Sequence, residues 1–301
     1  MKCAYPVTIK GRPFGCGQCL NCRINQRRVW THRLILEASQ HASNAFATIT
    51  YNPENMPPDR SLDPGHLRNF LKRLRKNLAP QRLRYFAAGE YGERSQDPHY
   101  HLALFGTPSC KNGQTRLSRT DKPCCDICTL YTRTWGFGHV FLGELNDQSA
   151  AYTCGYVLKK ITNKKGEENI AGRHPEFARM SNRPGLGAHV MDEVASTILE
   201  NRLEDALEDV PSTLRHGKII YPLGRYLRRR LRQRIGREPN APQSILDKME
   251  QEVLPLRQAA YATARPGFKE LAFREALISS VDGISIRQQH LHRLRNKQGI
   301  I

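Results

Sequence analysis

The sequence predicts an α+β fold, an antiparallel sheet with flanking helices of the ferredoxin-like kind, followed by a helical C-terminal region. Segments rich in β-branched and aromatic residues predict strands, at 46–51, 83–88, 99–105 and 138–143. Apolar residues at helical spacing predict helices, at 23–40, 64–78 and 147–160. From residue 46 the order is strand, helix, strand, strand, strand, helix, which favours antiparallel pairing with the helices on one face of the sheet.

The boundaries of these elements follow from local signals. An Asn-Pro pair closes the first strand. Asp63 and Pro64 supply an N-cap and a first-turn proline to the helix that follows. Beyond a polar stretch at 163–169, helical patterns continue at 191–207, 221–235, 241–261 and 269–297. We therefore expect three regions: a cysteine-rich segment with its helix at 1–44, a core at 45–165 with an insertion at 108–134, and a basic helical region at 166–301.

The composition favours a polyanionic partner. The chain has 301 residues with 47 Lys+Arg against 28 Asp+Glu, a formal net charge of +19, so nucleic acid is the expected ligand. Two predicted helices concentrate the cations, and solvated helix faces are the alternative explanation. The candidate DNA-binding residues are Arg68, Lys72, Arg73, Arg75 and Lys76 on the first and Arg228, Arg229 and Arg230 on the second.

The location of the protein is predicted from two absences in the sequence. No apolar run approaches the roughly 20 residues needed to span a bilayer, so no membrane association is expected. The first residues lack the apolar core of a secretory signal, which favours a reducing cytoplasm.

A metal site is predicted from the segment 84–105. His99 and His101 alternate with Tyr100, so on a strand the two imidazoles project from one face. The preceding strand leads to Glu90, whose carboxylate can return to the same point. Two imidazoles and a carboxylate suit a catalytic divalent cation with open positions. The alternative is a pair of satisfied histidines on a half-buried strand.

Eight of the nine cysteines form two groups of four, the number of ligands that structural Zn²⁺ takes. The groups are Cys3, Cys16, Cys19 and Cys22, then Cys110, Cys124, Cys125 and Cys128. The first has two C-x-x-C spacings, whereas the adjacent Cys124 and Cys125 make the second less regular. Redox chemistry and unbound buried thiols are the alternatives.

A candidate nucleophile lies on the predicted helix 147–160. Tyr152 and Tyr156 are four residues apart, so they share one helical face, and Lys159 and Lys160 follow one turn later. A phenol with a pKa near 10 needs help to lose its proton, and either lysine can favour the phenolate. The alternative is a pair of ordinary half-buried tyrosines. Together with a metal and a basic protein, these residues predict a DNA strand-transfer site.

The motifs resemble, in order, those of rolling-circle replication initiators of the HUH endonuclease superfamily. Residues 46–51 resemble the first motif, 98–101 the metal-binding second and 152–160 the tyrosine-bearing third. Three further segments, at 15–19, 89–92 and 181–187, resemble the initiators of gokushovirus-type microviruses, small single-stranded DNA phages. This closer resemblance covers about two thirds of the chain.

The resemblance implies an activity and a set of partners. Tyrosine attacks a phosphodiester of single-stranded origin DNA, becomes linked to the 5′ phosphate and leaves a 3′ hydroxyl for a host polymerase, with no need for ATP. Tyr156, in the Tyr-x-x-Lys spacing, is expected to be indispensable and Tyr152 its partner. Mg²⁺ or Mn²⁺ is implied on His99 and His101 with a nearby carboxylate, for which Glu90 has Glu93 and Asp97 as rivals.

The resemblance further implies a host helicase as partner and the cytoplasm of the bacterial host cell as location. Two other hypotheses stay open at this point. One is a zinc-stabilised nucleic-acid binding protein without catalysis, and the other is a metal-dependent nuclease that uses water.

Overall fold

The computed structural model describes residues 3–92, 94–115, 123–160 and 172–280, apart from the side chains of 156–160. The chain forms two compact units. One, Trp30–Val190, is called the sheet unit below; the other combines Met1–Val29 with Met191–Ile301 and is called the split unit. No helix within the described ranges has the length and apolar character that crossing a membrane requires.

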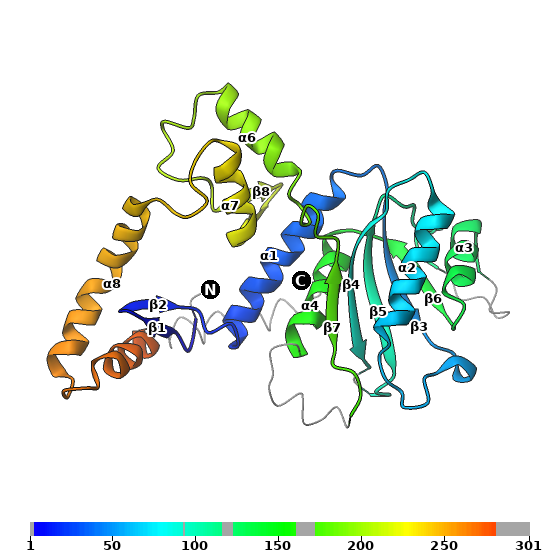
Figure 1. Cartoon of the computed structure of the whole chain (residues 1–301), viewed down its shortest axis with the longest axis horizontal. Helices are drawn as coiled ribbons and strands as arrows, with labels where there is room; N and C mark the ends of the chain where they lie inside the picture. Colours follow the sequence, from blue (N-terminus) through cyan, green and yellow to red (C-terminus); the bar gives the residue numbers. More distant parts are fainter. Residues whose placement is uncertain (1–2, 93, 116–122, 161–171, 281–301) are drawn as a thin grey trace. The chain divides into compact units, whose positions relative to one another are not determined.

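The sheet unit is built on a five-stranded sheet in the order β6-β3-β5-β4-β7 (Figure 1). Every pairing is antiparallel, which confirms the predicted class. The strands are β3 (Asn44–Thr50), β4 (Arg84–Tyr91), β5 (Pro98–Phe105), β6 (Val140–Glu144) and β7 (Phe177–Met180). The edge strand β7 was not predicted, because its four residues, Phe-Ala-Arg-Met, carry no periodic signal.

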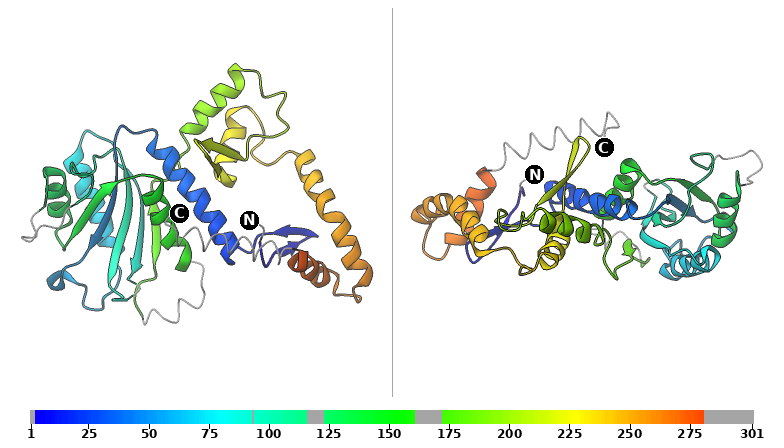
Figure 2. Two further views of the ribbon diagram at one scale, coloured as in Figure 1. Left: turned by 180° about the vertical axis from the view of Figure 1, so that it is seen from behind. Right: turned by 90° about the horizontal axis from the view of Figure 1, so that it is seen from above.

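Helices cover both faces of the sheet, so the expectation of helices on one face was wrong (Figures 1 and 2). On one face lie α2 (Pro64–Leu78) and α3 (Asp126–Trp135), and on the other lie α4 (Asp147–Lys160) and the end of α1 (Leu20–Ala38). The reason is in β5, where Tyr100, Leu102 and Leu104 face α2 while Ala103 and Phe105 face α4. Both of its faces need an apolar cover.

Helix α2 forms where the sequence signals place it. The Asp63 side chain accepts hydrogen bonds from the backbone N–H groups of Gly65 and His66, and Pro64 occupies the first turn. Its apolar stripe is buried against the sheet and comprises Leu67, Phe70, Leu71 and Leu74. A short 3-10 turn, η1 (Pro53–Asn55), precedes it in the loop after β3.

The insertion at 108–134 contributes to this core. Helix α3 buries Tyr131 and Trp135 completely, and the Trp135 indole N–H donates to the Thr50 carbonyl at 2.8 Å. The cysteine pattern obscured this helix in the sequence, although Cys128, Tyr131 and Trp135 follow helical spacing.

One buried carboxylate ties three segments of the sheet unit together. Glu37, on α1, pairs with the Arg84 guanidinium of β4, accepts the backbone N–H of Gly187 at 2.8 Å and contacts the His41 ring. Arg84 also donates to the Pro184 carbonyl. Burial opposes ionisation of Glu37, but His41, Gly187 and Arg84 outweigh it and lower its pKa.

The split unit combines two hairpins with helices. One hairpin is β1 (Val7–Ile9) with β2 (Arg12–Phe14), and the other is β8 (Thr213–His216) with β9 (Ile219–Pro222). The helices are α6 (Val190–Glu200), α7 (Gly224–Arg234) and α8 (Gln243–Thr263), followed by a helical stretch at 269–280.

Three of the predicted C-terminal helices differ in extent from the observed ones. The predicted helix 221–235 was wrong at its start, because Tyr221 and Pro222 belong to β9 and Gly224 bends the chain with φ +67°. The predicted 191–207 helix ends at Glu200. Residues 281–297 of the last predicted helix lie outside the described ranges.

Candidate metal centre and active site

The predicted metal ligands converge on one face of the sheet. Glu90 on β4 is directly opposite His99 on β5, and His101 is two residues further along the same strand. The Glu90 Oε1 atom lies 3.2 Å from His99 Nε2 and 2.6 Å from His101 Nε2. One donor atom from each residue lies within 4.8 Å of the others. The prediction that these three side chains meet is confirmed.

The far side of each imidazole is held by a partner that fixes its orientation. His99 Nδ1 lies 3.1 Å from the Asp97 carbonyl oxygen, and His101 Nδ1 lies 2.8 Å from Thr48 Oγ1. When each Nδ1–H donates to its oxygen, each Nε2 lone pair is directed at the common point beside Glu90. Two nitrogens and a carboxylate so arranged fit a divalent cation with remaining open positions.

The protonation equilibria reflect this proximity. Burial disfavours the charged form of Glu90, but hydrogen bonds from His101 and His99 outweigh burial and lower the pKa of the carboxyl. Burial likewise opposes charge on His99, yet the Glu90 carboxylate and the Asp97 carbonyl raise its pKa. Without a cation, a proton therefore takes its place between Glu90 and His99.

The rival carboxylates do not join this group. The Asp97 side chain pairs with the Arg60 guanidinium, and only its backbone carbonyl reaches His99. Glu93 lies outside the described residues. Of the three candidates, Glu90 is the one that the described structure brings to the histidines.

The Tyr152 ring lies directly beside the predicted metal site. Its centroid is 5.1 Å from that of His101, edge to face, and its side chain remains 41% exposed. Phe46 on β3 lies nearly parallel to His101 at 6.0 Å and edge to face with Tyr152 at 5.9 Å. Phe141 on β6 is exposed and contacts Phe46. These rings place a tyrosine and an open aromatic surface next to the histidines.

The remaining residues of the tyrosine motif are only partly described. Helix α4 continues through Tyr156, Lys159 and Lys160, so Tyr156 is one turn beyond Tyr152. The side chains of these three residues lie outside the described part of the structure. Their roles stay predictions.

The first cysteine group is brought together in the split unit. The sulfur atoms of Cys3, Cys16, Cys19 and Cys22 lie within 4.8 Å of one another, and the Cys3 and Cys19 sulfurs are 3.8 Å apart. Tetrahedral zinc with Zn–S bonds of about 2.3 Å needs sulfurs about 3.8 Å apart. Burial opposes ionisation of Cys19, yet backbone N–H groups of Cys22 and Ala4 and neighbouring thiols lower its pKa to about 7. A thiolate is therefore available to a metal.

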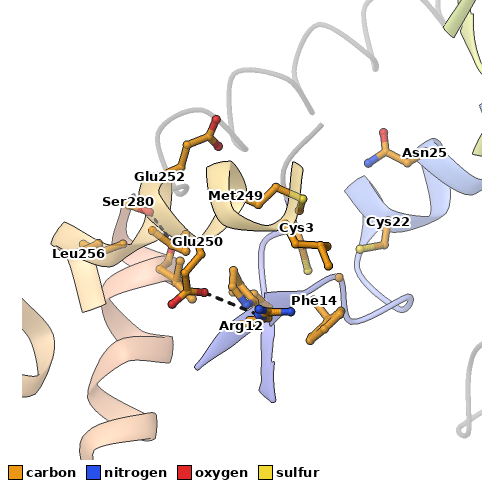
Figure 3. Close-up of a pocket in the computed structure, with 16 residues that line it drawn as sticks. Cys3, Arg12, Phe14, Cys22, Asn25, Met249, Glu250, Glu252, Leu256 and Ser280 are labelled. Atoms are coloured by element: carbon orange, nitrogen blue, oxygen red, sulfur yellow. Dashed lines mark hydrogen bonds and ion pairs between the residues drawn. The ribbon is translucent and has the colours of Figure 1, made fainter. Parts of the chain in front are cut away.

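An apolar cavity adjoins this group. It has a volume of about 630 Å³ and is lined by residues that include Cys3, Cys22, Phe14 and Met249, all within the split unit (Figure 3). Arg12 and Glu250 approach each other at its rim with a 3.8 Å contact.

The second cysteine group lies in the sheet unit, and the adjacency of Cys124 and Cys125 does not prevent convergence. The sulfurs of Cys110, Cys124, Cys125 and Cys128 lie within 4.8 Å of one another. The Cys110–Cys124 and Cys124–Cys128 sulfur distances are 3.4 and 3.8 Å. Both groups have the ligand type and spacing for zinc, and all nine cysteines are unbridged.

The predicted DNA-binding cations lie apart from the metal triad in the sheet unit. Arg68, Lys72, Arg73, Arg75 and Lys76 are exposed on α2, on the sheet face opposite His99 and His101. Arg73 donates to the Thr134 and Trp135 carbonyls at the end of α3, which is a structural contact. On α7 in the split unit, Arg228 and Arg230 pair with Asp209 and Asp192, while Arg229 is exposed.

Sequence reasoning missed three residues of this site. Thr48 pairs with both His101 and Phe141 across the sheet, and Phe46 packs on the His101 ring. The available signal was alternation in the segment 46–51, which places Phe46 and Thr48 on one strand face. Which other strand would pair with that face was not readable from the sequence.

Comparisons with known proteins agree with this geometry. Residues 44–161 match the model of a family described by the name "Replication-associated protein ORF2". The chain is 31% identical over 179 residues to "Replication-associated protein ORF2" of Spiroplasma virus 4, covering 57% of this chain and 55% of that protein. It is 29% identical over 172 residues to "Replication-associated protein VP4" of Bdellovibrio phage phiMH2K, covering 54% and 52%. The resemblance predicted from the motifs is confirmed.

A third relative is "Replication-associated protein ORF4" of Chlamydia phage 1, 27% identical over 155 residues, which cover 50% of this chain and 39% of that protein. The aligned part of the chain thus spans about half the length, or less, of the curated relatives it matches. No solved structure matches the chain.

Proposed function

From its similarity over residues 44–161 to replication-associated proteins of small phages, we propose that the protein starts rolling-circle replication by nicking and rejoining single-stranded DNA at an origin. The observation that carries the proposal is the placement of the exposed Tyr152 ring 5.1 Å from His101 in a group of two histidines and one carboxylate. A nucleophile and a cation-binding set then meet at one point.

The proposed reaction is a transesterification with balanced bonds. The tyrosine oxygen attacks phosphorus as its proton leaves, a bond forms between that oxygen and the 5′ phosphate, and the bond to the 3′ oxygen breaks. The 3′ oxygen departs with a proton as a free hydroxyl. A divalent cation on Glu90, His99 and His101, Mg²⁺ or Mn²⁺ by its donor set, supplies polarisation of the phosphoryl oxygen.

The chain's own residues orient these groups. Thr48 and the Asp97 carbonyl hold the imidazoles with Nε2 toward the site. Phe46 supports both the His101 ring and the Tyr152 ring, which limits the positions open to the phenol. Lys159 and Lys160 follow on the same helix, and we assign them to stabilising the phenolate.

Single-stranded DNA is the substrate that these surroundings favour. Bases of a single strand stack on exposed aromatic rings, whatever their sequence. Phe141 and Tyr152 are both exposed beside the histidines, at 37% and 41%, and the net charge of +19 attracts the backbone. Host polymerase and helicase are the partners that a free 3′ hydroxyl and a nicked circle require, and the cytoplasm of the bacterial host is the corresponding location.

The test is the covalent product. Single-stranded oligonucleotides that tile the encoding phage genome are incubated with the full chain and Mn²⁺, then separated on a denaturing protein gel. We expect a band shifted by covalent DNA and, by mass spectrometry, a phosphotyrosine in the segment 152–156. Cleavage without an adduct contradicts the proposal and indicates water as nucleophile. Binding without cleavage indicates a zinc-stabilised binding protein.

A further inference from the structure

A second charged site is present in the split unit, formed by α7 and its neighbours. A cavity of about 390 Å³ is lined by four arginines of that helix together with Ser212 and Asn240. The arginines are Arg225, Arg228, Arg229 and Arg232. No aromatic side chain lines it, so it offers guanidinium groups and no surface on which a base could stack.

Two of these arginines build the wall of the cavity. Arg232 is buried and donates from Nε and Nη2 to the two carboxylate oxygens of Asp209, both at 2.7 Å, and from Nη1 to the Pro239 carbonyl. Arg228 shares the same carboxylate at 2.5 Å. These bonds are charge-assisted and hold both side chains in place. The buried Nε of Arg228 has no acceptor among the described residues.

The other two arginines carry uncompensated charge. Arg225 and Arg229 are exposed, and within the described ranges neither forms an ion pair. Being four residues apart on a helix, they lie on one face. One carboxylate, Asp209, thus faces four guanidinium groups, which leaves a positive cavity suited to an anion.

The start of α7 adds to this positive potential. Gly224 lines the cavity with φ +67°, and a Cβ at that position would lie 2.6 Å from Val29 Cγ1, so glycine is required there. The first turn has neither an acidic residue nor a side-chain cap. Its first N–H groups lack partners within the helix, and the helix dipole favours an anion beside them.

We propose that this cavity binds backbone phosphates of single-stranded DNA, as a site additional to the metal centre. Guanidinium groups without a stacking surface recognise phosphate rather than a nucleotide base. The β8–β9 hairpin, which begins beside Ser212 and ends at Pro222, extends the surface with the exposed cations Arg215 and Lys218 and has no acidic residue. The identity of the strand as single-stranded DNA rests on the proposed function.

The test compares two double variants of the full chain that remove equal charge. R225Q/R229Q alters the cavity, whereas R265Q/R274Q removes two exposed arginines of the same unit that do not line it. Binding of a fluorescent 20-nucleotide oligothymidylate is measured between 0.1 and 0.5 M salt. Two lost phosphate contacts reduce the salt slope by about 1.4, which weakens binding about 25-fold at 0.1 M and about fivefold at 0.3 M.

The proposal is overturned if the two double variants change Kd and slope equally, or if R225Q/R229Q retains the wild-type slope. Inorganic phosphate alone provides a second arm: stabilisation of the wild type but not of R225Q/R229Q, with DNA binding equal in both, would assign the cavity to free phosphate instead. Adduct formation at saturating oligonucleotide should persist in R225Q/R229Q. If even the wild type forms no adduct, the proposed function fails while the binding data still decide on the cavity.

Discussion

Replacing Thr48 with valine should weaken cation binding without unfolding the sheet. The Thr48 hydroxyl lies 2.8 Å from His101 Nδ1, and His101 is buried at 4% exposure, so no water can readily take over. Valine keeps the branched shape and suits the strand. The loss leaves a buried imidazole N–H without its acceptor, which costs roughly 1–3 kcal/mol.

This cost appears in metal affinity because the lost hydrogen bond fixes the imidazole tautomer that presents Nε2. Removing such a partner typically reduces metal affinity about 10- to 100-fold, or about 1.4–2.8 kcal/mol. The measurement is Mn²⁺ titration of the full chain by electron paramagnetic resonance, which detects free Mn²⁺ directly and needs no substrate.

Thr50→Val is the matched control. Thr50 lies two residues further along β3, on the same strand face, and its hydroxyl makes only a 3.5 Å contact with the His139 carbonyl. We expect its Mn²⁺ titration to overlay that of the wild type. An unchanged titration for Thr48→Val, or an equal shift for both folded variants, would refute the role assigned to the Thr48–His101 hydrogen bond.

Four other predictions concern the same chemistry. His99→Ala should abolish cleavage yet leave oligonucleotide binding nearly intact, because affinity rests on many phosphate contacts; full cleavage would rule the metal site out. Tyr152→Phe and Tyr156→Phe should each retain some cleavage or joining of short oligonucleotides, with Tyr156→Phe the more damaged, the double variant inactive and neither single variant able to complete repeated rounds on a circle. Normal multi-round synthesis by Tyr152→Phe would make Tyr152 a packing residue. Purified protein should contain zinc that EDTA removes slowly, and Cys19→Ser should lower the melting temperature more than the rate of the chemical step; metal analysis without zinc returns the thiols to an unbound state. Because Glu90 raises the pKa of His99, Mn²⁺ affinity should increase as pH rises through that pKa, and the stability that the pair gives the metal-free protein should be lost over the same interval; affinity independent of pH contradicts this coupling.

The sequence was informative where side-chain period and chemistry agree. His99 and His101 could be placed on one strand face from alternation alone, and Glu90 from the hairpin between the two strands. Helix α2 was predictable from Asp63, Pro64 and its apolar stripe. In each case the signal lies within about fifteen residues of chain.

What escaped prediction depends on pairing between distant segments. Thr48 became part of the site only because β3 lies between β5 and β6. The strand β9 was read as helix, since its residues Ile219–Pro222 precede a strongly helical run with no polar break. Arg228 and Arg230 read as free cations, whereas acids 19 residues before and 38 residues before them, Asp209 and Asp192, are their partners.

The Glu37–Arg84 pair constrains how the sequence can evolve. Replacing either residue alone leaves its partner's charge buried and unpaired, at a cost of about 3–5 kcal/mol, a large share of the roughly 5–15 kcal/mol by which a domain is typically stable. Glu37 further holds the Gly187 backbone, so a substitution there also releases the loop that follows β7. Lineages should therefore retain both residues or exchange them together, and the pair should be recognisable in distant relatives as two alignment columns that change jointly.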